Sequence, residues 1–218
     1  MRKLLCCLLF AFLLLLTEHV LALDIKIMEQ KLEQHQNQLP KGDIMQTTYV
    51  KRVIDYMYEF DQELRNLFIK HQSDEQLGRL LKKLDAFHTA RMKEILEVHG
   101  WIVISKFGAE YDKKAWLIIQ HADDDPFFQA GVLFLLERLA NRGETDQKNY
   151  AYLYDRVAAK FHQIGLLQKY GTQVDLVKDN IKLQPYEGNI KDIDKHRNAV
   201  GLEPLADYLK KIKEIYKQ

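Results

Sequence analysis

Apolar residues recur every three or four positions through the first half of this chain, and this helical spacing limits its fold more than any other feature. From Thr47 to His71 they form one stripe, made of Val50, Val53, Ile54, Met57, Leu64, Leu67 and Phe68. A second stripe occupies residues 77–95, with a capping box predicted at Ser73 and Gln76 and a stop at Gly100. Two adjoining helices of this length predict an antiparallel helical hairpin.

Two further predicted helices are apolar on more than one side. The first ends with the segment Trp116–His121. The second is capped by Asp125, begins with Pro126 and continues to Arg142. Because a helix that is apolar nearly all round is buried when the protein folds, we expect these two helices to form the centre of the core.

The last third of the chain has a different pattern. Helices are expected over residues 146–163, over 192–199 and after Pro204. Between Leu167 and Pro185 the apolar period falls to two, which is typical of a β-hairpin. The sequence therefore predicts a mainly α fold, a single-domain bundle of about six to eight helices with a small β-hairpin near 167–185.

The first residues have the organisation of an export signal. A basic pair precedes an unbroken apolar run from Leu4 to Leu16, and Val20–Ala22 is a small-residue site suited to signal peptidase. The run is short for a hydrocarbon core about 30 Å thick, so a removed signal is favoured over a retained anchor. We expect a signal peptide at 1–22, cleavage after Ala22, and a single helical domain at 23–218 in the periplasm or the extracellular space.

Charge and cysteine content exclude several classes of function. The chain has 32 Lys and Arg against 31 Asp and Glu, and removing the signal, with two basic residues and one acidic residue, leaves 30 against 30. A neutral chain has no overall field to draw it onto nucleic acid, so no such partner is expected. Cys6 and Cys7 leave with the signal, so disulfides and thiolate metal sites are not expected. No transmembrane segment is expected after cleavage.

Short motifs along the chain follow one another in a recognisable order. They are Gly100–Trp101, Ser105, Gly108, Gln120–Ala122, Asp155–Arg156, Tyr170–Gln173 and Arg197–Leu202, preceded by Asp61–Gln62, Arg65, Asp85 and Thr89. This order resembles a bacterial family known only as a domain of unknown function, over nearly all of the predicted mature chain. Ile102 and His88 depart from the family pattern, which commonly has proline and asparagine there. The family has no established activity, so the resemblance implies a fold and a set of site residues and leaves the reaction open.

Charged residues lie within the apolar stripes of both hairpin helices. At about 100° per residue Asp61 falls in the middle of the first stripe, with Arg65 one turn later, in reach of an ion pair. On the second helix His88 lies inside the stripe and Asp85 at its edge. Both observations also have a purely structural explanation. The ion pair then only fixes helix packing, and the histidine is a core residue satisfied by one hydrogen bond.

Further polar groups lie near the ends of later elements. The pair Gln120–His121 ends the most apolar helix at the mouth of the predicted core, or is a helix end satisfied by loop carbonyls. The pair Asp155–Arg156 points away from the apolar face of its helix, which favours a solvated ion pair, although the resemblance includes both residues. Tyr170 and Gln173 offer a hydroxyl and an amide from the predicted hairpin, or form a plain turn.

We hypothesise that these polar side chains line one cleft, made of Asp61, Arg65, Asp85, His88, Gln120, His121, Arg156, Tyr170, Gln173 and Arg197. Two or three arginines in one cleft favour a small ligand that carries carboxylate or phosphate. His121 is the predicted general acid or base, oriented by Asp61 or Asp85. Signatures of a nucleophile elbow, a phosphate loop, a zinc helix and a calcium loop are missing, so no metal and no other cofactor is expected.

Two functions from different classes stay open at this point. The first is an exported small-ligand-binding protein or enzyme that uses this cleft on an anionic ligand in the cell envelope. The second is a non-catalytic interaction module of the cell envelope, in which the buried polar residues specify helix packing and an exposed face binds another protein.

Overall fold

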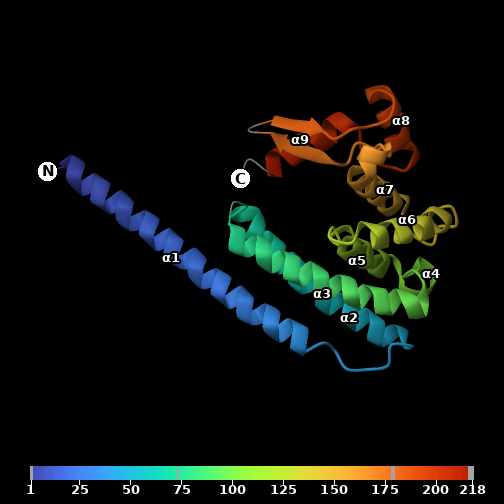
Figure 1. Cartoon of the computed structure of the whole chain (residues 1–218), viewed down its shortest axis with the longest axis horizontal. Coiled ribbons are helices and arrows are strands. Elements are labelled where there is room, and N and C mark those ends of the chain that lie inside the picture. The colour runs from blue at the N-terminus through green and yellow to red at the C-terminus, as the bar shows by residue number, and fades with distance from the viewer. Residues whose placement is uncertain (1, 73, 178–179, 216–218) are drawn as a thin grey trace.

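The computed structural model describes residues 2–72, 74–177 and 180–215, with side chains from Val20 onward. Its helices are α1 (Arg2–Asn37), α2 (Thr47–Lys70), α3 (Glu75–His99), α4 (Ile104–Phe107), α5 (Ala109–Gln120), α6 (Pro126–Ala140), α7 (Gln147–Phe161), α8 (Ile190–Ala199) and α9 (Leu205–Ile215). Between α7 and α8 lie the 3₁₀ turn η1 (His162–Ile164) and the strands β1 (Val174–Val177) and β2 (Asn180–Leu183). The predicted mainly α fold with one small hairpin is confirmed (Figure 1). Within the described ranges there are nine α-helices, of which α4 is a single turn.

The helical hairpin predicted from the two apolar stripes is formed by α2 and α3, which lie side by side (Figure 1). The stripe residues are buried between these helices and their neighbours. Asp74 caps α3 by accepting hydrogen bonds from the backbone N–H groups of Gln76 and Leu77. The predicted capping residue, Ser73, lies outside the described residues. Gly100 ends α3 with a φ of 67°, a conformation that favours glycine.

Helix α5 occupies the centre of the fold, in contact with α2 and α3, whereas α6 lies nearer the surface. Ile118 and Ile119 of α5 are buried as expected. Helix α6 packs one side against α7 and leaves the other side open, where Phe127 is 77% exposed and Phe134 is 62% exposed. The inner side of α6 belongs to the main core, as predicted, through Val132 and Leu136. The expected burial of its other apolar side is wrong, because no described element covers that side.

The C-terminal part of the chain is organised around Arg197 of α8, whose side chain is fully buried. Its Nε donates a hydrogen bond to the carbonyl of Glu203 (2.6 Å) and its Nη1 to the carbonyl of Tyr170 (2.8 Å). The guanidinium also lies 4.8 Å from the ring centroid of Tyr208 on α9. Arg197 therefore joins α8, α9 and the loop before β1, and the short antiparallel β1–β2 hairpin packs beside them.

Asp155 of α7 anchors the same loop from the other side. Its carboxylate accepts hydrogen bonds from the backbone N–H groups of Lys169, Tyr170 and Thr172, at 2.7 to 3.1 Å. The expectation that Asp155 forms a solvated ion pair is wrong, since this residue has no exposed surface. The loop covers the side of α7 that lies opposite its apolar face, and the backbone donors replace the water that the carboxylate would otherwise bind.

Helix α1 runs without interruption across the predicted cleavage site and then contacts α3 (Figure 1). Ile25 and Leu32 pack in an apolar cluster with α2 and α3, and His35 is buried among aromatic side chains of the same two helices. The side chains of the predicted apolar signal run lie outside the described residues, and the signal peptide stays a prediction. No helix in the described part of the chain is both long and apolar enough to cross a membrane.

Candidate functional site

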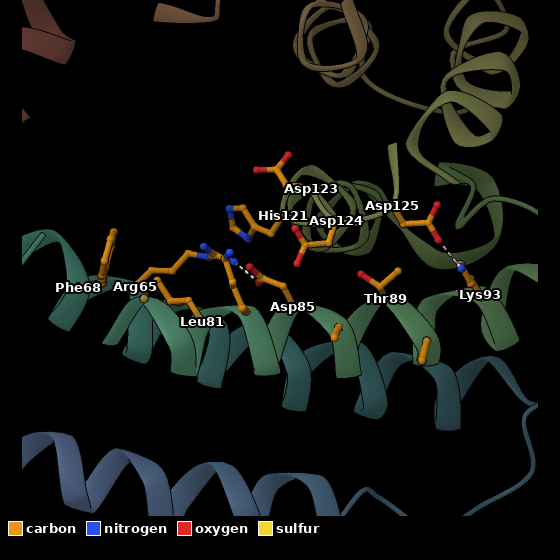
Figure 2. A pocket seen from close by; sticks show the side chains of 15 residues that line it. Arg65, Phe68, Leu81, Asp85, Thr89, Lys93, His121, Asp123, Asp124 and Asp125 are labelled. Atoms are coloured by element: carbon orange, nitrogen blue, oxygen red, sulfur yellow. Dashed lines mark hydrogen bonds and ion pairs between the residues drawn. The ribbon is translucent and has the colours of Figure 1, made fainter. Parts of the chain in front are cut away.

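A cavity of about 530 Å³ opens between α3 and the loop that joins α5 to α6 (Figure 2). This volume falls in the range of small-molecule sites, roughly 300 to 1,000 Å³. Small and apolar side chains of α3 form much of its wall. Its ionisable lining groups are Arg65, Lys82, Asp85, Lys93, His121, Asp123, Asp124 and Asp125. The cavity therefore contains three members of the predicted cleft, which are Arg65, Asp85 and His121.

The loop that bounds the cavity is held by a side chain of α6. Gln129 has no exposed surface, and its Nε2 donates hydrogen bonds to the carbonyls of Ile119 (3.0 Å) and Gln120 (3.2 Å). These bonds satisfy carbonyls at the end of α5 that have no partner inside the helix. Asp125 caps the start of α6 by accepting from the backbone N–H of Phe128. The two contacts fix the path of the loop and with it the position of His121.

Five side chains, from α2, from α3 and from the residue that follows α5, form one connected polar group at the cavity. Arg65 donates through Nε to Asp61 Oδ1 (2.9 Å) and through Nη2 to Asp85 Oδ1. His121 Nδ1 lies 3.0 Å from the same oxygen of Asp61, and Gln62 Nε2 donates to the other oxygen (2.8 Å). Asp61 is 1% exposed, so its carboxylate is surrounded by protein groups, and Arg65 and His121 lie between it and the cavity that they line. The predicted ion pair of Asp61 with Arg65 is confirmed.

The hydrogen bonds to Asp61 fix the protonation of this group. Burial alone favours the neutral acid, but the bonds from His121 and Gln62 and the charge of Arg65 outweigh it and lower the pKa of Asp61 to about 2. Burial lowers the pKa of His121, although Asp61 acts in the opposite direction. At neutral pH the imidazole is therefore uncharged, with its proton on Nδ1 facing the carboxylate. Nε2 then carries a lone pair, and this atom has no hydrogen-bond partner among the described residues.

Asp85 has the opposite character. Burial raises its pKa to about 7, and the charges of Asp61 and Asp123 act in the same direction against Arg65. Near neutral pH this carboxyl group is close to half protonated. The cavity thus holds a neutral imidazole with a free nitrogen and a carboxyl group that both donates and accepts protons, a pairing typical of acid–base sites.

The same three acceptor residues could in principle ligate a metal ion. One ligand atom each from Asp61, Asp85 and His121 lies within 4.8 Å of the others. Arg65, however, contacts both carboxylates and supplies the positive charge that a bound cation would bring. A metal ion in this position would have to displace the guanidinium of Arg65. The two carboxylates therefore fit this side chain better than they fit a metal ion.

A second charged cluster adjoins His121. Arg156 of α7 pairs through Nε and Nη2 with both carboxylate oxygens of Asp123, and its Nη1 donates to Gln173 Oε1 (3.1 Å). Lys160 lies 3.9 Å from Asp123. The positive charge of Arg156 helps to lower the pKa of His121. Two more members of the predicted cleft, Arg156 and Gln173, are thus held next to the cavity through Asp123, which lines it.

Two predicted residues lie close to the cavity but face away from it. His88 is on α3, one turn after Asp85, and its Nε2 lies 2.9 Å from Nε2 of His35 on α1. Gln120 is 7% exposed and faces α7, where its amide oxygen, oriented as an acceptor, bonds to Trp116 Nε1 and to the backbone N–H of Leu153. Neither side chain lines the cavity, and both are buried in the packing between helices next to the residues that do.

The remaining two members of the predicted cleft lie in the C-terminal part. Tyr170 packs against Tyr150 and Tyr154, with ring centroids 6.5 and 6.0 Å away. Arg197 is committed to backbone carbonyls. Neither residue lines the cavity. Of the arginines in the predicted cleft, Arg65 alone lines it, so the argument for an anionic ligand now rests on one arginine.

Some residues of the site were not identified from the sequence. Asp123 lies in the loop just before the predicted cap Asp125, and nothing in the sequence pattern separates it from its acidic neighbours. Gln129 does carry a signal, because a glutamine in an otherwise apolar helix indicates a buried hydrogen bond. Lys82 lines the cavity and lies three residues before Asp85, on the same side of α3. It has no partner among the described residues.

Fold and site together define a mainly α protein with a polar cavity large enough for a small molecule. Residues 49–218 match the model of a family described as a family of unknown function (DUF6624), and the chain belongs to this family. The match begins in α2 and does not include α1. No curated protein and no solved structure matches the chain.

Proposed function

We propose that this protein is an exported enzyme that uses His121 as a general base on a small ligand in the cavity. The observation that carries the proposal is the 3.0 Å contact between His121 Nδ1 and the buried carboxylate of Asp61. A carboxylate in this position selects one tautomer, holds the ring and stabilises the imidazolium that forms when Nε2 accepts a proton. Asp85, with a pKa of about 7, is the proton donor of the same cavity.

The ligand that fits this cavity best carries an anionic group. Arg65 has a third nitrogen, Nη1, without a partner among the described residues, and Lys82 lines the same cavity unpaired. A carboxylate or phosphate oxygen bound there would gain charge-assisted hydrogen bonds. Because Lys82 and Asp85 lie one turn apart on α3, an anion at this position would place the rest of the ligand beside Asp85 and His121.

One observation favours a second function, a non-catalytic interaction module of the cell envelope. Arg65 already satisfies both Asp61 and Asp85 without any ligand, as a purely structural ion network would. Under this alternative the polar group specifies the packing of α2, α3 and α5, and removing His121 would mainly weaken the fold.

The two functions are separated by the variant His121→Asn, whose amide can still donate to Asp61. A panel of small carboxylates and phosphate monoesters is screened for compounds that raise the melting temperature of the wild type, and each hit is followed by NMR for chemical change. We expect turnover to fall about 10²- to 10⁴-fold in the variant. Its melting temperature should change by less than about 3 °C. The exposed His162, changed to asparagine, serves as the control. Absence of any stabilising compound, or a large loss of stability with unchanged turnover, would exclude the enzyme.

A further inference from the structure

Three consecutive aspartates, in the loop that joins α5 to α6, line the cavity and differ in their partners. Asp123 is paired with Arg156 of α7, and Asp125 with Lys93 of α3 at 2.5 Å. Asp124 lies between them and has no hydrogen bond or ion pair within the described ranges. Its carboxylate is on the side of the loop that faces α3, whereas that of Asp123 is turned away from α3 (Figure 2). The middle aspartate therefore presents an uncompensated negative charge to the cavity.

An uncompensated charge of the opposite sign lines the same cavity. Lys82 of α3 has no partner among the described residues. Asp85 and Thr89 follow it on the same side of the helix, roughly 4.5 and 10.5 Å farther along the axis. Asp124 faces α3 between the positions of these two residues (Figure 2). The unpaired lysine and the unpaired aspartate thus lie on opposite sides of Asp85 along α3.

The charges of the cavity wall balance one another. Its described lining residues include the three aspartates of the loop and three cations, which are Arg65, Lys82 and Lys93. Asp85 adds less than one negative charge near neutral pH, and His121 adds none. A ligand with only negative charge gains the attraction of Lys82 and loses part of it to repulsion by Asp124. A ligand with one charge of each sign gains from both residues, so the wall favours a molecule without net charge.

Much of the remaining wall is apolar. It includes Phe68, Leu81, Ala86 and Ala90. Alkyl carbon atoms gain from contact with such a wall, because water is displaced from both surfaces. The cavity therefore suits a ligand whose charged groups are joined by methylene or similar apolar atoms.

We infer that the cavity binds a small zwitterion, with a carboxylate or phosphate at Lys82 and an ammonium group at Asp124. This inference rests on the proposed function, because it keeps the anion at Lys82 and adds a second point of attachment. The ammonium group has three hydrogens to donate, and the carboxylate of Asp124 and the hydroxyl of Thr89 are acceptors on two facing walls. With the charged groups several bonds apart, the atoms that join them lie beside Asp85 and His121, the acid and base of the proposed function.

Equilibrium binding to the full chain tests the inference. Isothermal titration calorimetry at neutral pH uses the His121→Asn variant, so that no probe is consumed. The carboxylate probes are the linear ω-amino acids from glycine to aminocaproate, and the phosphate probe is aminoethyl phosphate. Each is compared with the acid of the same length that lacks the amine. We expect the best amino probe to bind at least about tenfold more tightly than its counterpart, since it gains a charge-assisted contact with Asp124.

Two variants assign the ends of the ligand. Asp124→Asn should reduce the preference for the amino probe to less than about threefold, while the acid without an amine binds as before. Lys82→Gln should weaken both members of each pair at least about threefold, since both carry the anion. Lys83→Gln is the matched control, because Lys83 is the next residue of α3, is exposed and does not line this cavity. Asp124 and Lys82 are exposed, so either change should alter the melting temperature by less than about 3 °C.

The outcomes separate this inference from the proposed function. Equal binding of both members of every pair, or no binding of any amino probe, overturns the zwitterion, and the anion site is then judged by its own screen. A preference for the amino probe that survives in Asp124→Asn also overturns the inference. An amino probe that binds as expected supports the zwitterion site, whereas the proposed catalysis is judged by turnover alone.

Discussion

The buried histidine pair behind the site makes a quantitative prediction about stability and pH. His35 and His88 are 4% and 1% exposed and lie 2.9 Å apart, with His35 stacked on Tyr56 at a centroid distance of 4.3 Å. Burial lowers the pKa of His35 from 6.5 to about 4. Burial, with the nearby positive groups, lowers the pKa of His88 to about 3. Both rings are therefore neutral in the folded protein well below the pH at which they titrate in the unfolded chain.

The sign and size of the effect follow from proton counting. Since the folded pKa values lie below the unfolded value, the contribution to stability is complete above about pH 6.5 and is lost as the pH falls toward 4. Near pH 5 the unfolded chain binds nearly two more protons at these positions than the folded chain. Each such proton contributes about 1.4 kcal/mol per pH unit to the slope, which gives about 2.7 kcal/mol per pH unit for the pair.

The assay compares urea unfolding of the wild type with the double variant H35Q/H88Q between about pH 5 and pH 7. Glutamine carries an amide where each imidazole has its Nε2, so the hydrogen bond can persist while the titration is removed. We expect the unfolding free energy of the wild type to fall more steeply toward acid pH, by the amount given above. The slope from Asp85, whose raised pKa acts with the opposite sign, is common to both proteins and cancels. His162→Gln, at an exposed position, should follow the wild type. Parallel curves for the wild type and the double variant would refute the reasoning.

Two further predictions concern Asp155 and Arg65. Asp155→Asn turns an amide donor toward backbone N–H groups that need an acceptor, so we expect a loss of about 2 to 4 kcal/mol in unfolding free energy and faster hydrogen exchange at residues 169–172. The exposed Asp175, changed to asparagine, should alter stability by less than about 0.5 kcal/mol. Arg65→Gln removes the cation between two carboxylates, and the variant should gain stabilisation by Zn²⁺ in a thermal shift assay. The wild type should show none, and equal stabilisation of both proteins would contradict the role assigned to Arg65.

The part of the site that sequence reasoning recovered is the part encoded locally. Asp61 was predicted to be buried because it falls in the middle of an apolar stripe, and Arg65 was placed near it because i and i+4 lie on one helix face. His121 could be singled out because it follows a helix whose last turn is strongly apolar. Each of these inferences needs only the geometry of one helix.

The contacts that sequence reasoning missed join residues far apart in the chain. The pairing of Arg156 with Asp123 spans 33 positions, and no periodicity within α7 indicates it. The same limit explains Asp155, which lies off the apolar face of α7 and is buried by a loop instead. In the same way, the apolar character of α6 predicted burial on both sides, whereas the described elements cover one side only.

Helix α1 gives the site a property that the family domain alone does not supply. The family match begins at residue 49, so His35 lies outside it. His35 nevertheless contacts His88, which lies one turn from Asp85 on α3. The pKa of His88 responds to the charges of Asp61, Arg65 and His121. A protonated His88 would add a positive charge near these three groups. It would then compete with His121 for electrostatic stabilisation by the carboxylate of Asp61. By packing His35 against His88, α1 helps to keep this imidazole buried and neutral, and the carboxylate of Asp61 bonds to Arg65, His121 and Gln62.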